Sequence, residues 1–517
     1  MNWKLTRPRL WIVIPLALGG AAALLFILGS LRYDGPEGLW LRLRAEIAAR
    51  RPHPQYVPTP LPTSTAVPQA VAVLIQENDT SPPVEVRDSL RPTLAAGSLM
   101  PTDETERGSA QALDATPAAV QATGMVSATR ARAGPDLTEL STLSALSAPT
   151  RTRPVRTATA VPSAARTATP TASPTATPSP TPAPSPLYRP ASGAVEVTGM
   201  THIWQKWNNC GPATLSMNLS YYGLALDQLD VAAVLKPNRD DKNVSPQEMA
   251  AFAGSQGLHA LVRVNGDADR LRLWLSNGMP VLIETWLEVE PGNGMGHYRL
   301  LTGYDDARQE WTVYDSYVSA GVDASQPYRG IRMAYADVER WWAVFNRTYI
   351  LVYTDELAPM ALSILGEDAD DGLMWQRALR QAQTGVDQNP DDPFAWFNLG
   401  SDLVTLDRFE EAAAAYDQAR VIGLPWRMLW YQFGPFRAYY ETGRYQELTV
   451  LAEATIATDG EIEETYYWKG LGLAAQGDLA GARQAWQHAL GLNPNYAAAV
   501  AALAAGDAAL PEGDVFE

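Results

Sequence analysis

The chain has 517 residues, enough for three or four domains of ordinary size. It carries 40 Lys and Arg against 57 Asp and Glu, a formal net charge of -17, whereas proteins that bind nucleic-acid phosphates are usually basic, so we exclude nucleic-acid binding. One cysteine and five histidines exclude an intrachain disulfide framework and a cysteine-rich metal site, and nothing in the sequence calls for a cofactor or a metal ion.

An uncharged apolar segment, Leu10–Leu31, follows a short N-terminal tail at residues 1–9. A helix of this length spans roughly 33 Å, enough to cross the apolar core of a bilayer. The segment is also longer than the apolar region of a cleaved signal peptide, which is about 7–15 residues. The sequence therefore predicts an uncleaved transmembrane anchor at residues 10–31 and a single-pass protein of the cell membrane.

Residues 32–187 are predicted to form a disordered linker rich in Pro, Thr and Ser. Between residues 52 and 186 there are 22 prolines but no Trp and no Phe, so too few core-forming side chains offset the entropy cost of ordering this stretch. Its last part, residues 167–186, has the composition of an extended, glycosylated stalk on an exported protein. This composition places the folded domains outside the cell, although arginines just after the anchor favour the cytoplasmic side.

Residues 188–356 alternate between helix and strand patterns, which predicts an α+β domain, and they contain the one cysteine. Cys210 stands in the sequence Asn-Cys-Gly-Pro-Ala, where Pro212 suits a first helical turn and the apolar positions that follow have helical spacing. The dipole of a helix favours a thiolate at its N-terminus, so Cys210 is a candidate nucleophile. The alternative interpretation is a buried structural cysteine.

Two predicted strands after the cysteine supply a base and a carboxylate. His297 opens the strand at 296–305, and Asp315 lies near the end of the strand at 310–317. A hairpin turn at 305–309 would bring the two side chains together. The order Cys, His, Asp then permits a triad in which the imidazole takes the thiol proton and the carboxylate fixes its tautomer.

This domain resembles the papain-like peptidases of the bacteriocin-processing (double-glycine leader) type, especially their stand-alone relatives. The matching motifs are Gln205 ahead of Asn-Cys-Gly-Pro-Ala, then Gly-His297-Tyr, then Tyr-Asp315. The resemblance implies Cys210 as nucleophile, His297 as base and Asp315 as the group that orients the imidazole. It also implies Gln205 as an oxyanion-hole donor beside the Cys210 amide. Because Asn209 stands where an acidic residue is frequent and no transporter follows, the family's leader-peptide substrate is not carried over.

The C-terminal region, residues 373–510, is predicted to be helical and repetitive. Units that begin at Asp391 and Glu463 have large residues early, small Gly or Ala where two helices touch, and Pro at the exit, and so resemble tetratricopeptide repeats. The unit between them is degenerate, because Pro435 is expected to interrupt its first helix.

The predicted fold class is thus multidomain: an N-terminal membrane helix, a disordered Thr/Pro-rich stalk, an α+β papain-like domain and all-α tetratricopeptide repeats. The predicted parts in chain order are a tail (1–9), the anchor (10–31), the linker (32–187), the peptidase domain (188–356), an acidic linker (357–372), the repeats (373–510) and a tail (511–517).

The leading functional hypothesis is a membrane-anchored cysteine peptidase that hydrolyses peptide bonds and uses its repeats to recruit a peptide or protein, as substrate or partner. The alternative is an inactive or weak peptidase-fold adaptor that acts through its repeat surface. The sequence has a residue for each of four roles: nucleophile, base, orienting carboxylate and oxyanion donor. This favours the enzyme, because a site that has lost its activity usually lacks one of these residues. Acyl transfer would use the same triad, and the sequence does not separate it from hydrolysis.

Limited proteolysis tests the predicted linker. Because residues 52–186 lack core-forming side chains, a broad-specificity protease should cut within them first and release a stable fragment that begins near Leu187. The cleavage sites can be read by mass spectrometry of the fragments. Protection of this stretch under conditions that cut elsewhere would contradict the prediction.

Overall fold

The computed structural model describes residues 35–36, 39–40, 42–44, 54–61, 187–289, 292–322, 325–458 and 461–505. All of them belong to one compact unit, which Met1–Pro82 and Ala183–Glu517 form together. The predicted anchor, most of the predicted linker and the C-terminal tail lie outside the described residues. Among the residues described, no helix is long and apolar enough to cross a membrane.

A mixed domain is built around one antiparallel sheet. Its central order is β2-β7-β3-β4-β5-β6, and β1 pairs with the last three residues of β4, beyond the end of β3. The hairpin expected at residues 305–309 joins β4 to β5. The strands are β1 (Ala194–Glu196), β2 (His259–Arg263), β3 (Val281–Glu288), β4 (Gly294–Asp305), β5 (Glu310–Tyr314), β6 (Ile331–Ala334) and β7 (Tyr349–Tyr353).

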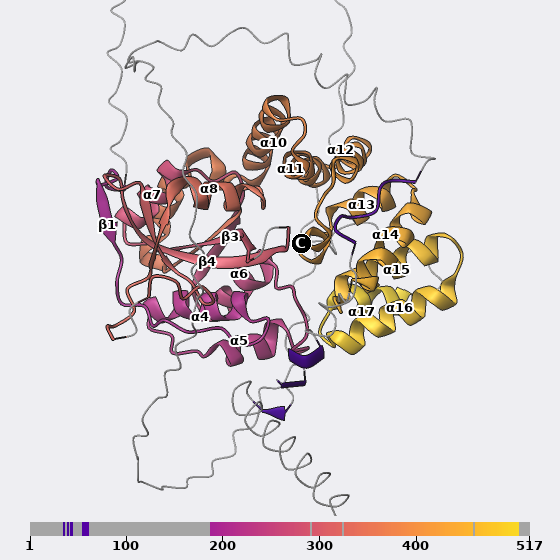
Figure 1. The fold of residues 1–517 in the computed structure, drawn as a ribbon, viewed down its shortest axis with the longest axis horizontal. Helices are drawn as coiled ribbons and strands as arrows, with labels where there is room; N and C mark the ends of the chain where they lie inside the picture. The colour runs from indigo at the N-terminus through magenta and orange to yellow at the C-terminus, as the bar shows by residue number, and fades with distance from the viewer. Residues whose placement is uncertain are drawn as a thin grey trace, which may run out of the picture. The chain divides into compact units, whose positions relative to one another are not determined.

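Helices cover both faces of this sheet (Figure 1). Side chains alternate along β3, so that Leu282 enters one hydrophobic core while Val281 and Ile283 enter the other. The first core contains side chains of α4 (Cys210–Tyr221), α5 (Gln228–Leu235) and α6 (Pro246–Ser255), and the second those of α7 (Ala268–Ser276), α8 (Tyr335–Ala343) and α9 (Ala358–Leu365). The sheet is therefore buried on both sides, as in the predicted α+β domain.

The predicted acidic linker at residues 357–372 is instead mostly helical. It contains α9, whose Ala361, Ile364 and Leu365 are buried in the core of the mixed domain. Two short 3₁₀ helices flank α9, at Asp355–Leu357 and Gly366–Ala369. The apolar residues ahead of the acidic ones bury against the sheet, so the mixed domain extends past residue 356.

The C-terminal region consists of helices in successive antiparallel pairs, as predicted for tetratricopeptide-like repeats (Figure 1). Small residues allow the helices of a pair to touch: a Cβ added at Gly400 would lie 2.7 Å from the Tyr416 ring, and one at Gly470 would overlap the Trp486 ring. The helices are α10 (Asp371–Gln388), α11 (Pro393–Thr405), α12 (Phe409–Ile422), α13 (Gly434–Glu441), α14 (Tyr445–Ala457), α15 (Glu463–Ala475), α16 (Leu479–Leu492) and α17 (Ala497–Ala505).

The degenerate middle unit differs from the expectation in its details. Pro435 does not interrupt a helix, because it lies in the first turn of α13, where a missing N–H costs nothing. The residues before it form a separate 3₁₀ helix, η5 (Trp426–Trp430). This unit therefore keeps its two helices but has an inserted segment between α12 and α13.

Candidate active site

Cys210 is the first residue of α4, and the residues Gly211–Leu219 that follow it in the helix are all buried. Asn209, which precedes the cysteine, is buried as well, and its side-chain amide donates a 2.8 Å hydrogen bond to Gln228 Oε1. Gln228 also accepts the backbone N–H of Lys206 at 2.7 Å. These contacts fix the loop that presents the thiol at the positive end of the helix dipole.

His297 and Asp315 meet across the hairpin of β4 and β5. His297 lies on β4, Asp315 directly follows β5, and imidazole Nε2 is 3.0 Å from carboxylate Oδ1. Both side chains are almost completely buried. Since Nε2 faces the carboxylate, the other ring nitrogen, Nδ1, is left for the cysteine.

Asp315 stays ionised in this buried position because several groups neutralise it. Burial by itself would raise the pKa of the carboxyl, but the charges and hydrogen bonds of His297 and Arg299 lower it well below its usual range. The backbone N–H groups of Tyr317 and Val318 each donate to Oδ1 at 2.8 Å. A fixed negative charge thus lies behind the imidazole.

This charge sets the protonation of the other two groups. Burial lowers the pKa of His297, but the charge and hydrogen bond of Asp315, together with the bond to Cys210, outweigh it and raise the pKa to about 9. Burial would raise the pKa of the Cys210 thiol, but His297, the backbone of Tyr298 and the Lys236 charge lower it below its ordinary value. The arrangement favours a thiolate–imidazolium pair.

Gln205 is tied to the residue that follows Asp315. Its backbone N–H donates to Ser316 O at 2.8 Å, and its Oε1 accepts the Ser316 hydroxyl, also at 2.8 Å. Because Oε1 is occupied, the side chain offers its Nε2 hydrogens to other groups. An oxyanion-hole donor at this position would act through that amide nitrogen.

Arg299 belongs to the site, although the sequence analysis did not single it out. It lies two residues after His297 on the same face of β4, is 1% exposed, and donates from Nε to Asp315 Oδ2 at 3.0 Å. Its guanidinium also donates to Thr285 and lies 5.1 Å from the centre of the Trp341 ring. In the sequence, its position two residues after His297 on a predicted strand is the signal that could indicate this role.

Two residues from other parts of the chain also border the site, and nothing in the sequence indicates that they do. Glu284 on β3 is buried, its Oε2 has no hydrogen-bond partner in the described part of the chain, and burial followed by the Cys210 charge raises its pKa to about 8. Tyr431, which follows η5, packs on Gly296, where an added Cβ would lie 3.1 Å from the tyrosine ring. The repeats therefore form part of the wall beside His297.

Another histidine near the site, His202, has a packing role. His202 stacks on the Tyr328 ring with 3.5 Å between ring centres, and its Nε2 is 2.8 Å from the backbone oxygen of Asp315. Within the described ranges, no group of three or more His, Cys, Asp and Glu side chains could hold a metal ion.

A cysteine at a helix start, beside a histidine paired with a buried carboxylate on an antiparallel sheet, is an arrangement similar to that of papain-like peptidases. Residues 197–349 match the Peptidase_C39 like family, which confirms for this part of the chain the resemblance seen in its sequence. None of the curated proteins matches the sequence.

Solved structures with similar parts include two peptidase domains and a repeat protein. The peptidase domain of Streptococcus ComA, a bifunctional ABC transporter involved in quorum sensing, is 14% identical (TM-score 0.25), with 31% of this chain and 100% of that chain covered. A double-glycine-motif protease from an AMS/PCAT transporter, in complex with its leader peptide, is 17% identical (TM-score 0.23; 31% and 94% covered). A tetratricopeptide-repeat protein from Thermus thermophilus is 17% identical (TM-score 0.21; 28% and 80% covered).

The buried pair of Asp315 and Arg299 predicts a non-additive effect on stability. Asp315→Asn leaves the arginine buried without its counter-charge, and Arg299→Met leaves the carboxylate without one, so each single change should cost roughly 3–5 kcal/mol. The double variant should cost clearly less than the sum of the two, because neither charge is then left alone.

Urea unfolding of the native chain and the three variants measures these free energies. Strictly additive costs would show that the two side chains do not stabilise each other. An exposed ion pair on the same domain, Arg340 with Asp337, supplies the control, and its double variant should cost little.

Proposed function

We propose that this protein is a membrane-anchored cysteine peptidase that hydrolyses peptide bonds through Cys210, His297 and Asp315. The proposal rests on three buried groups that act on one another. Asp315 contacts His297 and keeps it protonated, and His297 in turn lowers the pKa of the Cys210 thiol. A structural cysteine has no need of such neighbours, whereas a nucleophile does.

In the proposed reaction, the Cys210 thiolate attacks the carbonyl carbon of the scissile peptide bond. The carbonyl oxygen becomes an oxyanion, which the Cys210 backbone N–H and Gln205 Nε2 stabilise. The His297 imidazolium gives its proton to the leaving amine as the C–N bond breaks, which leaves a thioester on the cysteine. His297, now neutral, takes a proton from water, the hydroxide displaces the thiolate, and the acid product leaves.

The proposal includes two further parts that rest on the sequence. Residues 10–31 would anchor the protein as a single span, with the folded domains outside the cell. The repeats would recruit the peptide or protein substrate, or a partner. The match of residues 197–349 to the Peptidase_C39 like family supports a peptide as the class of substrate.

Multiplexed cleavage of a synthetic peptide pool tests the proposed activity. The purified full-length chain is incubated with the pool, and the products are identified by mass spectrometry. The native chain should produce new termini that Cys210→Ala, the matched control, does not produce. Folded native protein that cleaves nothing, and that does not react with an electrophilic cysteine probe, would instead support the peptidase-fold adaptor.

Gln205 separates oxyanion stabilisation from thiol activation. Gln205→Ala should lower kcat/KM on the best peptide by about a hundredfold, or about 3 kcal/mol, with little change in labelling by a small electrophile. His297→Ala should lower both rates, because it removes the proton acceptor. Equal losses of labelling in the two variants would contradict the assigned role of Gln205.

A further inference from the structure

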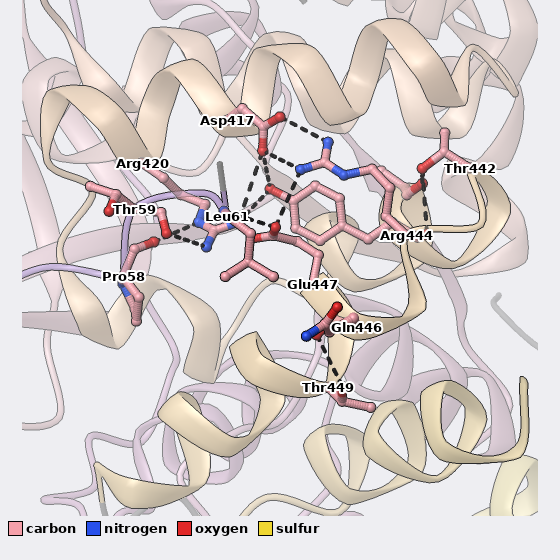
Figure 2. A network of polar contacts seen from close by, with 12 residues as sticks. Pro58, Thr59, Leu61, Asp417, Arg420, Thr442, Arg444, Gln446, Glu447 and Thr449 are labelled. Atoms are coloured by element: carbon pink, nitrogen blue, oxygen red, sulfur yellow. Dashed lines mark hydrogen bonds and ion pairs between the residues drawn. The ribbon is translucent and has the colours of Figure 1, made fainter. Parts of the chain in front are cut away.

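A segment of eight residues within the predicted disordered linker lies against the repeats, and Figure 2 shows its Pro58, Thr59 and Leu61. We call Pro54–Leu61 the docked segment. It is extended, and Tyr56 forms a β-bridge with Pro425 in the loop between α12 and η5. In the same loop, Leu424 O accepts the Val57 N–H at 2.9 Å. The expectation of disorder throughout residues 32–187 is therefore wrong for this segment.

Arg420 on α12 donates hydrogen bonds to the backbone of the docked segment. Its Nε donates to Pro58 O at 2.7 Å, and its Nη2 donates to Thr59 O at 3.2 Å. At the end of the segment, the Leu61 N–H donates to Glu447 Oε2 at 2.9 Å. Hydrogen bonds therefore hold the segment at Pro58, Thr59 and Leu61, as Figure 2 shows.

A charge-balanced cluster of repeat side chains fixes Arg420 in place. Its Nη1 donates to Glu447 Oε1 at 2.7 Å and to the Tyr439 hydroxyl at 2.8 Å. Asp417 in turn accepts two hydrogen bonds from Arg444, at 2.8 and 2.9 Å. The Arg420 side chain is 1% exposed, so its Nε and Nη2 donors would be costly to bury if the two segment carbonyls did not accept from them.

Apolar contacts complete the site. Val57 is 4% exposed and belongs to the same hydrophobic cluster as the repeat helices. Tyr56 lies over Gly423, where a Cβ would come within 3.4 Å of its ring, and the φ of +122° at this glycine also disfavours other residues. We call the surface formed by Arg420, Gly423, Leu424 and Glu447 the groove, and the buried Val57 side chain and the Tyr56 ring give it a preference in register.

The sequence of the docked segment suits this groove. The segment, Pro-Gln-Tyr-Val-Pro-Thr-Pro-Leu, contains no charged residue. This matches the side chains beneath it, where the charges of Arg420 and Arg444 are balanced by those of Glu447 and Asp417. Its three prolines favour an extended backbone and lack N–H groups that would need acceptors. The entropy lost on docking is correspondingly small.

We propose that this groove of the repeats is a binding site for an extended, uncharged, proline-containing strand, and that Pro54–Leu61 of the same chain is its occupant. The chain is then held to the folded unit at residue 61 as well as at residue 187, so both ends of the connection between these two residues are fixed. If residues 10–31 are the proposed anchor, it is joined to the docked segment by residues 32–53, of which Arg44 also contacts the folded unit. The groove itself does not depend on the proposed peptidase activity.

Cleavage of the linker in the full-length chain tests this proposal. A recognition sequence for a site-specific protease is placed near residue 120, the chain is cut in detergent, and the two pieces are separated by gel filtration. The N-terminal piece should stay with the C-terminal piece in a one-to-one complex. Val57→Asp should release it, because a charge would be buried in the apolar part of the groove, while the repeats are unchanged.

Gln55→Asp is the matched control, because it adds the same charge at an exposed position of the docked segment and should leave the pieces together. The N-terminal piece has other contacts, since Arg44 forms ion pairs with Asp240 and Glu461, Arg42 lies over the Trp207 ring and Leu39 is buried. These few contacts should not retain the piece alone. Separation of the native pieces, or retention of the Val57→Asp piece, would overturn the proposal. A complex with two copies of each piece would show that the occupant comes from a second chain, and would overturn it too.

Discussion

The ionised carboxylate of Asp315 is the group on which the candidate site depends. A buried charge is stable only when it is paired and hydrogen-bonded, and here Arg299, His297 and two backbone N–H groups supply those partners. Arg299 keeps the carboxylate charged, the carboxylate raises the pKa of His297 to about 9, and His297 lowers the pKa of Cys210. The reactivity of the thiol at the start of α4 is therefore set by a residue on another element, at the end of β5.

The insertion between α12 and α13 connects this site with the repeats. Arg427 in η5 donates to Asn293 and to Gly294 O, at the start of the strand that carries His297, and Tyr431 packs on Gly296. The loop just before η5 is the one that receives the docked segment. The 3₁₀ helix η5 therefore lies between the loop that receives the docked segment and the wall of the candidate site.

Much of the fold and of the candidate site could be predicted from local patterns in the sequence. The helix start at Cys210, the hairpin between His297 and Asp315, and the small residues opposite large ones in the repeats all follow from spacing and residue type. The acidic residues after Gly366 dominate the composition of this stretch, so the sequence predicts a linker where the apolar residues before them form α9. The contributions of Glu284, Tyr431 and the docked segment depend on contacts between distant parts of the chain, which periodicity and composition do not encode.

The most direct test is the titration of the thiol itself, which is simple here because the chain has one cysteine. Ultraviolet absorbance of the thiolate is followed against pH in the native chain and in His297→Ala, with Cys210→Ala as the blank. The account predicts that the native thiol ionises below the ordinary pKa of about 8.5, and that His297→Ala raises its pKa, since the largest effect that opposes burial is then removed. A native thiol that titrates like a free cysteine, with the same pKa in His297→Ala, would contradict it.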